Sequence, residues 1–206
     1  AATALAAKHG AKPDSRILAI VGCGFQAWHQ VEAVSGVLPV THVLACDLSR
    51  DRAMSLVARI EQKLGLQATH ARSVNEAVSA SDIIVTCTTG TKVVVMDGMV
   101  RPGSFIAAVG ADNPDKQELD PHLFERARIL VDDLDQCSKS GDLSHAIRAG
   151  TATPDSVTAS LSDLASGAKP GRGSEDEIVI FDSTGTGLQD VAAAAAAYAA
   201  VKQSNL

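Results

Sequence analysis

Apolar runs and amphipathic segments alternate along most of this chain. Strands are predicted at 16–21, 40–46, 67–70, 82–86, 105–109, 129–131 and 178–181. Helices are predicted at 1–9, 26–37, 50–64, 74–80, 161–164 and 188–202. Most of the strand segments are continuously apolar, which is typical of strands that are covered on both faces. The order of elements predicts an α/β protein of the Rossmann type, with a doubly wound, mainly parallel sheet and helices on both faces.

Two stretches near the end of the chain depart from this alternation. Residues 150–177 are rich in Ser, Thr, Asp, Gly and Pro, and the only element expected there is the short helix at 161–164. Consecutive alanines at 192–197 lie inside the last predicted helix. Because no stretch approaches the ~20 apolar residues of a membrane span, we interpret the alanine run as a buried helix and expect no membrane partner.

A glycine-rich turn follows the first predicted strand. Residues 22–27 read GCGFQA, which matches the pattern G-x-G-x-x-A. In this pattern Gly22 permits a tight turn, and Gly24 lets the backbone approach a pyrophosphate. The small Ala27 lets the following helix pack closely on the sheet, with its first amides directed at the phosphates. The turn therefore predicts a dinucleotide-binding site.

An acidic residue ends the second predicted strand, where such a site needs one. Asp47 stands 25 residues after Gly22, close to the spacing expected of a carboxylate that holds a ribose diol. The alternative is that Asp47 caps the helix that begins near Arg50. A carboxylate here repels a 2′-phosphate, so NAD is expected rather than NADP. The neighbouring Arg50 and Arg52 keep NADP possible.

The ends of the fourth and fifth predicted strands carry further polar groups. The hydroxyls of residues 86–89, TCTT, either contact the cofactor or satisfy their own backbone. Asp112 follows the fifth strand and is the candidate acid/base, because a partly desolvated carboxylate near a nicotinamide can exchange protons. Alternatively, Asp112 or Asn113 shapes the turn before Pro114. The spacing alone favours neither interpretation.

Composition narrows the possible partners. The net charge of −6 argues against nucleic acid, which needs a basic face. The four cysteines form no C-x-x-C pair and are expected to be buried, reduced thiols of a cytoplasmic protein. The histidines show no metal-ligand spacing, so no metal is expected. The pairs 132–133 and 141–142 are interpreted as turn and cap residues rather than catalytic ones.

Several motifs together resemble one known family across nearly the whole chain. They are ATALAA at 2–7, VGCGFQA at 21–27, SDIIVTCTT at 81–89, RPGS at 101–104, VGAD at 109–112, Lys116, EL at 118–119, FDSTG at 181–185 and QDVA at 189–192. This set is similar to that of the ornithine cyclodeaminase/μ-crystallin family. The resemblance implies a Rossmann-type domain and a second, N-terminal domain that supplies the dimer interface and most of the substrate pocket.

The resemblance also implies how the chain is organised. Residues 1–206 are expected to form a single NAD(P)-binding domain, and its helices at 1–10 and 186–206 are expected to pack toward the second domain. The complete protein is expected to be a homodimer. By position, the pyrophosphate loop comprises Gly22, Gly24, Phe25, Gln26 and Ala27, Asp47 is the ribose acid, and Asp112 is the catalytic aspartate. The other implied cofactor contacts are Thr88, Ala108, Val109, Lys116 and Ser183.

The implied activity is that of an NAD(H)-dependent amino-acid or imino-acid oxidoreductase or cyclodeaminase. Conversion of ornithine to proline and ammonia is the first expectation, with a small amino acid or imine as substrate. Reduction of ketimines or oxidation of alanine are alternatives within the family. A second hypothesis is a module that binds a dinucleotide without catalysis. A third, an S-adenosylmethionine-dependent methyltransferase, is disfavoured by the complete G-x-G-x-x-A turn and by the Asp112 and Ser183 motifs.

Overall fold

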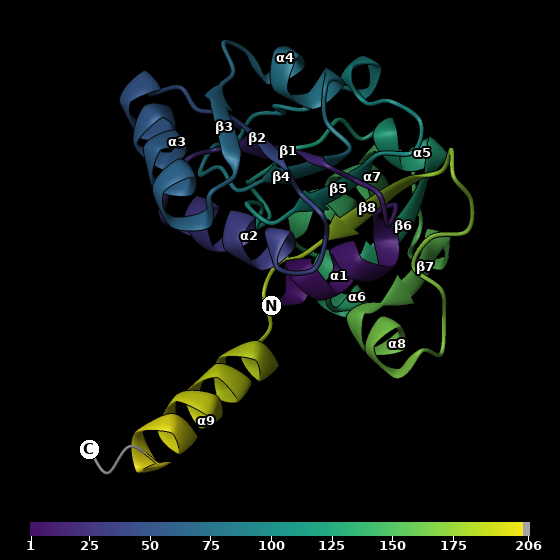
Figure 1. Cartoon of the computed structure of the whole chain (residues 1–206). Coiled ribbons are helices and arrows are strands. Elements are labelled where there is room, and N and C mark those ends of the chain that lie inside the picture. The colour runs from purple at the N-terminus through teal and green to yellow at the C-terminus, as the bar shows by residue number, and fades with distance from the viewer. Residues whose placement is uncertain (204–206) are drawn as a thin grey trace.

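A parallel sheet forms the centre of the molecule (Figure 1). The computed structural model describes residues 1–203, so the end of the segment 186–206 lies outside the described residues. In the described part, eight strands follow the order β3-β2-β1-β4-β5-β8-β6-β7, and every neighbouring pair is parallel. They are β1 (Ile17–Val21), β2 (His42–Cys46), β3 (Gln67–His70), β4 (Ile83–Thr86), β5 (Phe105–Ala108), β6 (Ala127–Val131), β7 (Val157–Ser160) and β8 (Ile178–Asp182).

Helices cover both faces of this sheet. One apolar core lies under α1 (Ala2–Gly10), α2 (Phe25–Ser35), α3 (Arg50–Leu64) and α8 (Leu161–Ser166). The other lies under α4 (Val74–Ser79), the 3₁₀ turn η1 (Asp97–Met99), α5 (Leu123–Arg126), α6 (Leu134–Cys137) and α7 (Gly141–Ala149). The doubly wound Rossmann-type fold is therefore confirmed. The sheet is entirely parallel in the described residues rather than mainly so.

The sequence explains these elements locally. The central strands β4 and β5 are buried along their whole length, as continuous apolar runs require. Helix α3 begins where the Ser49 side chain accepts a hydrogen bond from the Arg52 amide, at 3.4 Å. It ends at Gly65, whose φ of +66° is left-handed and costs glycine little. Its predicted bounds, 50–64, are confirmed.

The sequence did not predict the short elements η1, α5, α6 and η2 (Pro154–Ser156), nor the strand β7 and the helix α7. The edge strand β7 lies in the polar stretch 150–177, and only Ala159 among its four residues is fully buried. An edge strand with one buried position has a weak apolar signal, which is why the pattern missed it. Gly141 and Asp142, which are interpreted from the sequence as turn and cap residues, are the first two residues of α7, and Gly141 has φ +83°. The first residues of this helix are polar or small, yet they are buried.

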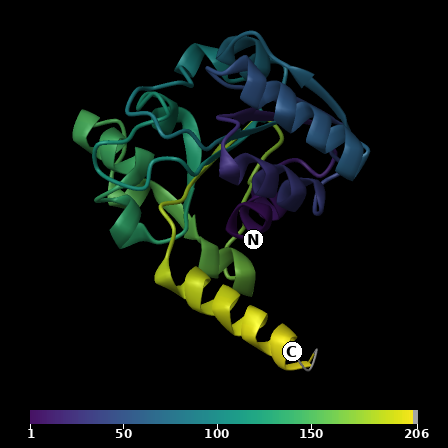
Figure 2. The ribbon, with the colours of Figure 1, turned by 90° about the vertical axis from the view of Figure 1, so that its left-hand side faces the viewer.

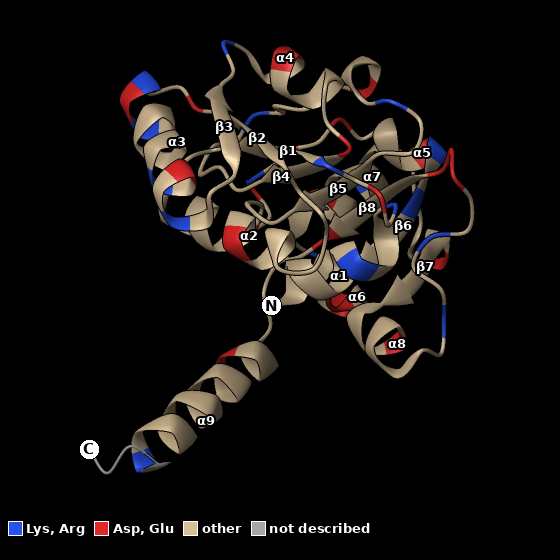
Figure 3. Ribbon diagram, in the orientation of Figure 1, with Lys and Arg blue, Asp and Glu red and all other residues tan. Residues whose placement is uncertain are grey.

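The interpretation of the alanine run as a buried helix is wrong for this chain. Helix α9 (Gly187–Gln203) extends away from the two helical layers, as both views show (Figures 1 and 2). Residues 191–200 are all exposed, and Tyr198 is 70% exposed. Its only charged residues are Asp190 and Lys202, near its two ends (Figure 3). An apolar sequence indicates that a helix can be buried, but it does not say which part of the protein would cover that helix.

Within residues 1–203, no helix combines the length and the apolar character needed to cross a membrane. Helix α1 lies against the sheet of this chain, and its buried side includes Thr3, Ala6 and Ala7. Gly10 at its end allows close packing, because an added Cβ would lie 2.7 Å from the ring of Phe105. The expectation that α1 and α9 also pack toward a second domain stays a prediction.

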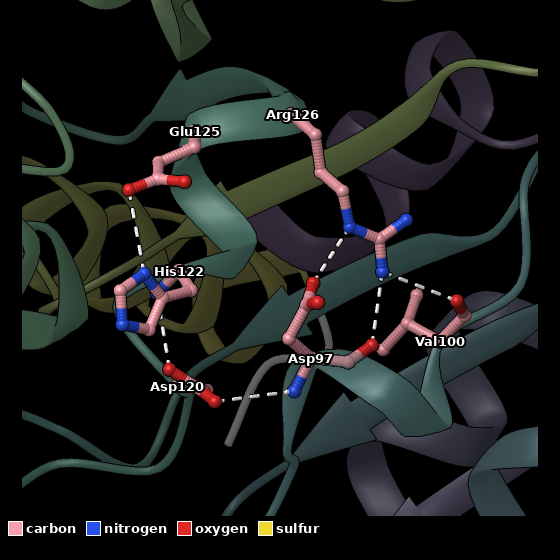
Figure 4. Close-up of polar contacts among 6 residues, drawn as sticks. All are labelled: Asp97, Val100, Asp120, His122, Glu125 and Arg126. Atoms are coloured by element: carbon pink, nitrogen blue, oxygen red, sulfur yellow. Dashed lines mark hydrogen bonds and ion pairs between the residues drawn. The ribbon is translucent and has the colours of Figure 1, made fainter.

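A cluster of hydrogen bonds holds the amino end of β6. Asp97 of η1 accepts a hydrogen bond from Arg126 Nε at 2.6 Å, and Arg126 Nη2 donates to the Asp97 and Val100 carbonyls (Figure 4). Asp120 accepts a hydrogen bond from the Asp97 amide. Because Arg126 stands directly before β6, this cluster joins η1 to the start of that strand. It lies at the edge opposite to the candidate site described next.

Candidate functional site

The glycine-rich turn lies where the strand order reverses, between the carboxyl ends of β1 and β4. In open α/β sheets, ligands bind in the crevice at this point. Gly22 has φ +92°, and an added Cβ would meet the Cys87 carbonyl oxygen at 2.9 Å. Gly22 is therefore required both by its backbone conformation and by the close approach of the loop after β4.

The start of α2 has the features of a phosphate-binding helix end. Gly24 is the N-cap and gives no side-chain cap, and an added Cβ there would meet no atom within 4 Å. Unpaired amides at a helix start, facing open space, fit a diphosphate. Phe25 is 87% exposed and Gln26 is exposed, whereas Ala27 is fully buried against the sheet. The structure thus fits the roles expected of this turn.

Asp47 is bound to the glycine-rich turn itself. Its Oδ2 accepts a hydrogen bond from the Cys23 amide, and its Oδ1 accepts one from the Ser49 amide, both at 2.7 Å. Ser49, rather than Asp47, caps α3, so the capping alternative is wrong. A carboxylate oxygen can accept more than one hydrogen bond, which leaves capacity for ribose hydroxyls. Its role in ribose binding stays a prediction.

The loop after β5 separates the two interpretations of Asp112. The Asn113 side chain accepts a hydrogen bond from the Asp115 amide at 3.0 Å, so Asn113 shapes this turn. The side chain of Asp112 is 57% exposed, and its Oδ1 lies 2.8 Å from Lys116 Nζ. Asp112 also accepts a hydrogen bond from the Asn113 amide group at 3.2 Å. Both contacts are made by Oδ1, and the carboxylate is more than half exposed, which is compatible with the acid/base interpretation.

Four predicted residues from separate parts of the chain line one pocket. Gln26, Val109, Asp112 and Ser183 surround a pocket of about 240 Å³. Its other walls come from the start of α1, from α2 and from the segment after β8: Ala1, Ala2, Thr3, Gln30, Thr184, Gly185 and Gln189. The pocket therefore joins the carboxyl ends of β5 and β8 to the phosphate-binding helix.

A larger pocket lies on the other side of the turn but lacks these groups. It has a volume of about 340 Å³ between α2 and α3, and it includes Gly24 and Phe25. Arg59 covers the Trp28 ring there, 4.0 Å from the ring centre. Of the two pockets, the smaller one contains the candidate acid/base Asp112. The predicted residues that line neither pocket are Gly22, Ala27, Asp47, Thr88, Ala108 and Lys116.

Three carboxylates near the site are buried, which the sequence did not predict. Glu118, Asp142 and Asp182 are each at most 1% exposed. Asp142 Oδ1 accepts hydrogen bonds from the amides of Glu118 and Leu119, and Asp182 accepts from the first amides of α7. Glu118 stood in a motif, yet nothing in the sequence distinguished it from an exposed loop residue. Burial raises the pKa of all three carboxyl groups.

Ser183 is held by a fourth carboxylate. Its Oγ donates a hydrogen bond to Asp132 Oδ2 at 2.8 Å, and the Gly185 amide donates to the same oxygen at 2.8 Å. Asp133 caps α6, as expected of a cap residue, whereas Asp132 orients the segment that lines the pocket.

Among residues 1–203, no three His, Cys, Asp or Glu side chains are grouped so that they could hold a metal ion.

The cysteines are mostly buried, as the structural interpretation expects, and Cys87 is only partly buried. All four thiols are free, and three of them are buried. Burial raises the pKa of Cys23 to about 12, and it also raises the pKa values of Cys46, Cys87 and Cys137. Thiols that stay protonated at neutral pH are poor nucleophiles and poor metal ligands.

Raised carboxyl pKa values predict a pH dependence of stability. Burial raises the pKa of Asp142 to about 7 from 3.8, so the folded state holds a proton that the unfolded state has lost between these values. The free energy of unfolding should therefore decrease as the pH rises through this window. The Asp142→Asn variant lacks this titrating group. Between about pH 4 and pH 7, we expect its free energy of unfolding to decrease by ~2 kcal/mol less than that of the wild type. Urea unfolding at several pH values tests this, and an unchanged slope would contradict it.

A phosphate-binding helix start and an acid at the end of β2, at the point where a doubly wound sheet reverses, define a dinucleotide-binding domain of the Rossmann type. The model of the ornithine cyclodeaminase/mu-crystallin family matches residues 1–205. The chain belongs to this family, which confirms the resemblance seen in its motifs.

Individual relatives agree with this assignment. The alanine dehydrogenase of Archaeoglobus fulgidus is 40% identical over 200 residues, which cover 96% of this chain and 61% of that protein. A solved archaeal alanine dehydrogenase dimer with bound NAD matches with a TM-score of 0.94 at 36% identity, covering 100% of this chain and 63% of that one. The Δ1-pyrroline-2-carboxylate reductase of Thermococcus litoralis, solved with NADH and L-proline, has a TM-score of 0.95 at 29% identity, covering 100% and 64%. The chain thus spans about three-fifths of the length of the curated relative.

Proposed function

We propose that this chain is the NAD(H)-binding domain of an enzyme that interconverts an α-amino acid and the corresponding imine. The observation that carries the proposal is the pocket in which Asp112 and Ser183 meet the start of the phosphate-binding helix. The family membership and the NAD or NADH present in the two solved relatives support this cofactor.

The residues of this chain divide the work of binding. The amides at Gly24 and Phe25 bind the diphosphate, and Asp47 binds the adenosine ribose. Thr88, Val109 and Ser183 surround the nicotinamide end, while Lys116 lies beside Asp112 and neutralises its charge. A nicotinamide held by these residues would supply reversible hydride transfer at the carbon that bears the amino group. Asp112 accepts or donates the proton at the substrate nitrogen.

Substrate identity divides the proposal into two candidates. The alanine dehydrogenase and pyrroline-carboxylate reductase relatives favour plain oxidation and reduction between an amino acid and its imine. The motif set around Asp112 also fits ornithine cyclodeamination, which releases ammonia without net consumption of NAD. NADH oxidation in the presence of Δ1-pyrroline-2-carboxylate, or of pyruvate and ammonia, tests the first candidate. Ammonia release from ornithine with a trace of NAD tests the second.

Binding without turnover is the remaining alternative, and it calls for two proteins. The assays are run with the 206-residue chain and with the full-length protein. Activity of the full-length protein alone identifies this chain as the cofactor module. Whether the protein is a dimer is read from its mass in solution, and the proposal of a homodimer rests on the family relationship.

Calorimetric titration tests the cofactor directly. The protein should bind NADH more tightly than NADPH, and it should not bind S-adenosylmethionine. Asp47→Ala removes hydrogen bonds from a charged acceptor to the ribose, worth ~1.5–3 kcal/mol, so NADH affinity should fall at least about tenfold. Asp14→Ala, an exposed aspartate before β1, is the control and should bind NADH like the wild type. Binding of S-adenosylmethionine without NADH would overturn the proposal.

A further inference from the structure

A single buried carboxylate joins two loops of the pocket edge. Glu118 is fully buried. Its Oε2 accepts hydrogen bonds from Thr86 Oγ1 at 2.6 Å and from the Gly110 amide at 2.8 Å. Its Oε1 accepts one from the Thr88 amide at 2.7 Å. Two of these donors, Thr86 and Thr88, lie at the end of β4 and in the loop after it. The third donor, Gly110, lies in the loop after β5.

The surroundings leave room for this carboxylate only because residue 110 is glycine. An added Cβ at Gly110 would overlap the Glu118 carboxylate and would lie 2.6 Å from the Thr88 carbonyl oxygen. Gly110 stands two residues before Asp112, and Thr88 is an expected cofactor contact. The loops that carry these two groups are therefore pressed together around Glu118.

Glu118 is itself fixed from behind. Asp142 Oδ1 accepts a hydrogen bond from the Glu118 amide at 2.8 Å. Asp182 in turn accepts hydrogen bonds from the amides of Asp142 and Leu143, at 3.3 and 2.9 Å. Because Asp182 directly precedes Ser183, the three carboxylates connect the ends of β4, β5 and β8. Residues at the ends of β5 and β8 line the pocket, and the loop after β4 carries Thr88, an expected cofactor contact.

The donors to Glu118 also set it apart from an ordinary ion pair. Among the described residues they are two backbone amides and one hydroxyl, and none is a cationic side chain. Burying a carboxylate costs desolvation energy. Here the hydrogen bonds that offset this cost hold two backbone segments in place, and a neutral side chain would accept such bonds less strongly.

We propose that Glu118 is a positioning residue that holds the Thr88 loop and the Asp112 loop at the spacing that cofactor and substrate require. Through one carboxylate it determines the distance between the loop expected to contact the cofactor and the loop whose Asp112 lines the pocket. This inference rests on the proposed binding of NADH.

The test compares Glu118 with a carboxylate that does similar work at the opposite edge. Asp82 accepts hydrogen bonds from the amides of Arg16 and Ile17, at 2.9 and 3.0 Å, before β4. Glu118→Gln presents an NH₂ group to a donor, so a loop must move away. We expect it to weaken NADH binding at least about tenfold, measured by calorimetry beside the thermal unfolding midpoint. Asp82→Asn should lower that midpoint and leave NADH affinity within about twofold of the wild type.

A milder variant keeps the test decisive if Glu118→Gln does not fold. Thr86→Val removes one donor to Glu118 with little change of shape, and it should weaken NADH binding about three- to tenfold. If the folded Glu118→Gln variant binds NADH with wild-type affinity, the positioning role is overturned while NADH binding itself stands. If Glu118→Gln does not fold, wild-type affinity of Thr86→Val leads to the same conclusion. Equal losses of affinity in Asp82→Asn would also overturn it, because the effect would then reflect stability alone. A wild-type protein that does not bind NADH overturns both proposals.

Discussion

Asp112→Asn should reduce turnover by about 10²–10⁴-fold and leave NADH affinity within about threefold of the wild type. The asparagine side chain has nearly the same shape, but it cannot exchange a proton with the substrate nitrogen. Asp112 is suited to that exchange because its half-exposed carboxylate faces the pocket and Asn113 shapes the turn instead. Steady-state assays of the full-length protein give turnover, and calorimetry gives the affinity.

A neighbour in the same loop provides the control. Asp115 is exposed and lies outside the pocket, so Asp115→Asn should keep wild-type turnover. Turnover of Asp112→Asn equal to that of Asp115→Asn would remove Asp112 from the mechanism. A parallel loss of NADH affinity in Asp112→Asn would instead indicate that the ion pair with Lys116 serves cofactor binding.

Arg172→Met should lower the free energy of unfolding by ~3–5 kcal/mol. Arg172 is partly buried. Within residues 1–203, its guanidinium donates to the backbone carbonyl oxygens of Gly10, Gly103, Ser104, Ser174, Glu175 and Glu177. It thereby ties the end of α1 to the start of β5 and to the segment before β8. Methionine fills part of the space but removes the guanidinium donors, and among these carbonyls that of Ser104 keeps a hydrogen bond, from the Val179 amide. Each buried carbonyl left without a donor costs ~1–3 kcal/mol.

An exposed arginine tests whether this loss is specific. The Arg72 side chain is 86% exposed, lies just before α4 and pairs with Glu76 in the first turn of that helix. Arg72→Met should lower the free energy of unfolding by no more than ~0.5 kcal/mol, because exposed ion pairs contribute little. Urea unfolding of both variants gives the comparison. A loss below ~1 kcal/mol in Arg172→Met would show that water replaces the guanidinium.

The candidate site was predictable where chemistry depends on local spacing. Gly22, Gly24 and Ala27 follow one strand within six residues, and Asp47 ends the next. The spacing could not tell whether Asp112 is an acid/base or whether Asp112 or Asn113 shapes the turn, because both residue types shape turns. The hydrogen bond from the Asp115 amide shows that Asn113 shapes the turn, and the acid/base role of Asp112 stays a prediction. The edge strand β7 was missed for a similar reason, since pairing with β6 rather than its own apolar content makes it a strand.

The sequence by itself determined the layered α/β architecture, the position of the phosphate-binding turn and the family. Continuous apolar runs and a glycine pattern express backbone geometry that neighbouring residues impose on one another. Only the tertiary structure decided that α9 stands exposed and that Glu118 holds the pocket edge together. Burial depends on which surface lies opposite, and the Glu118 carboxylate meets partners 30 and 32 residues away in the chain. Such contacts exist only once the strands lie side by side, so no local pattern encodes them.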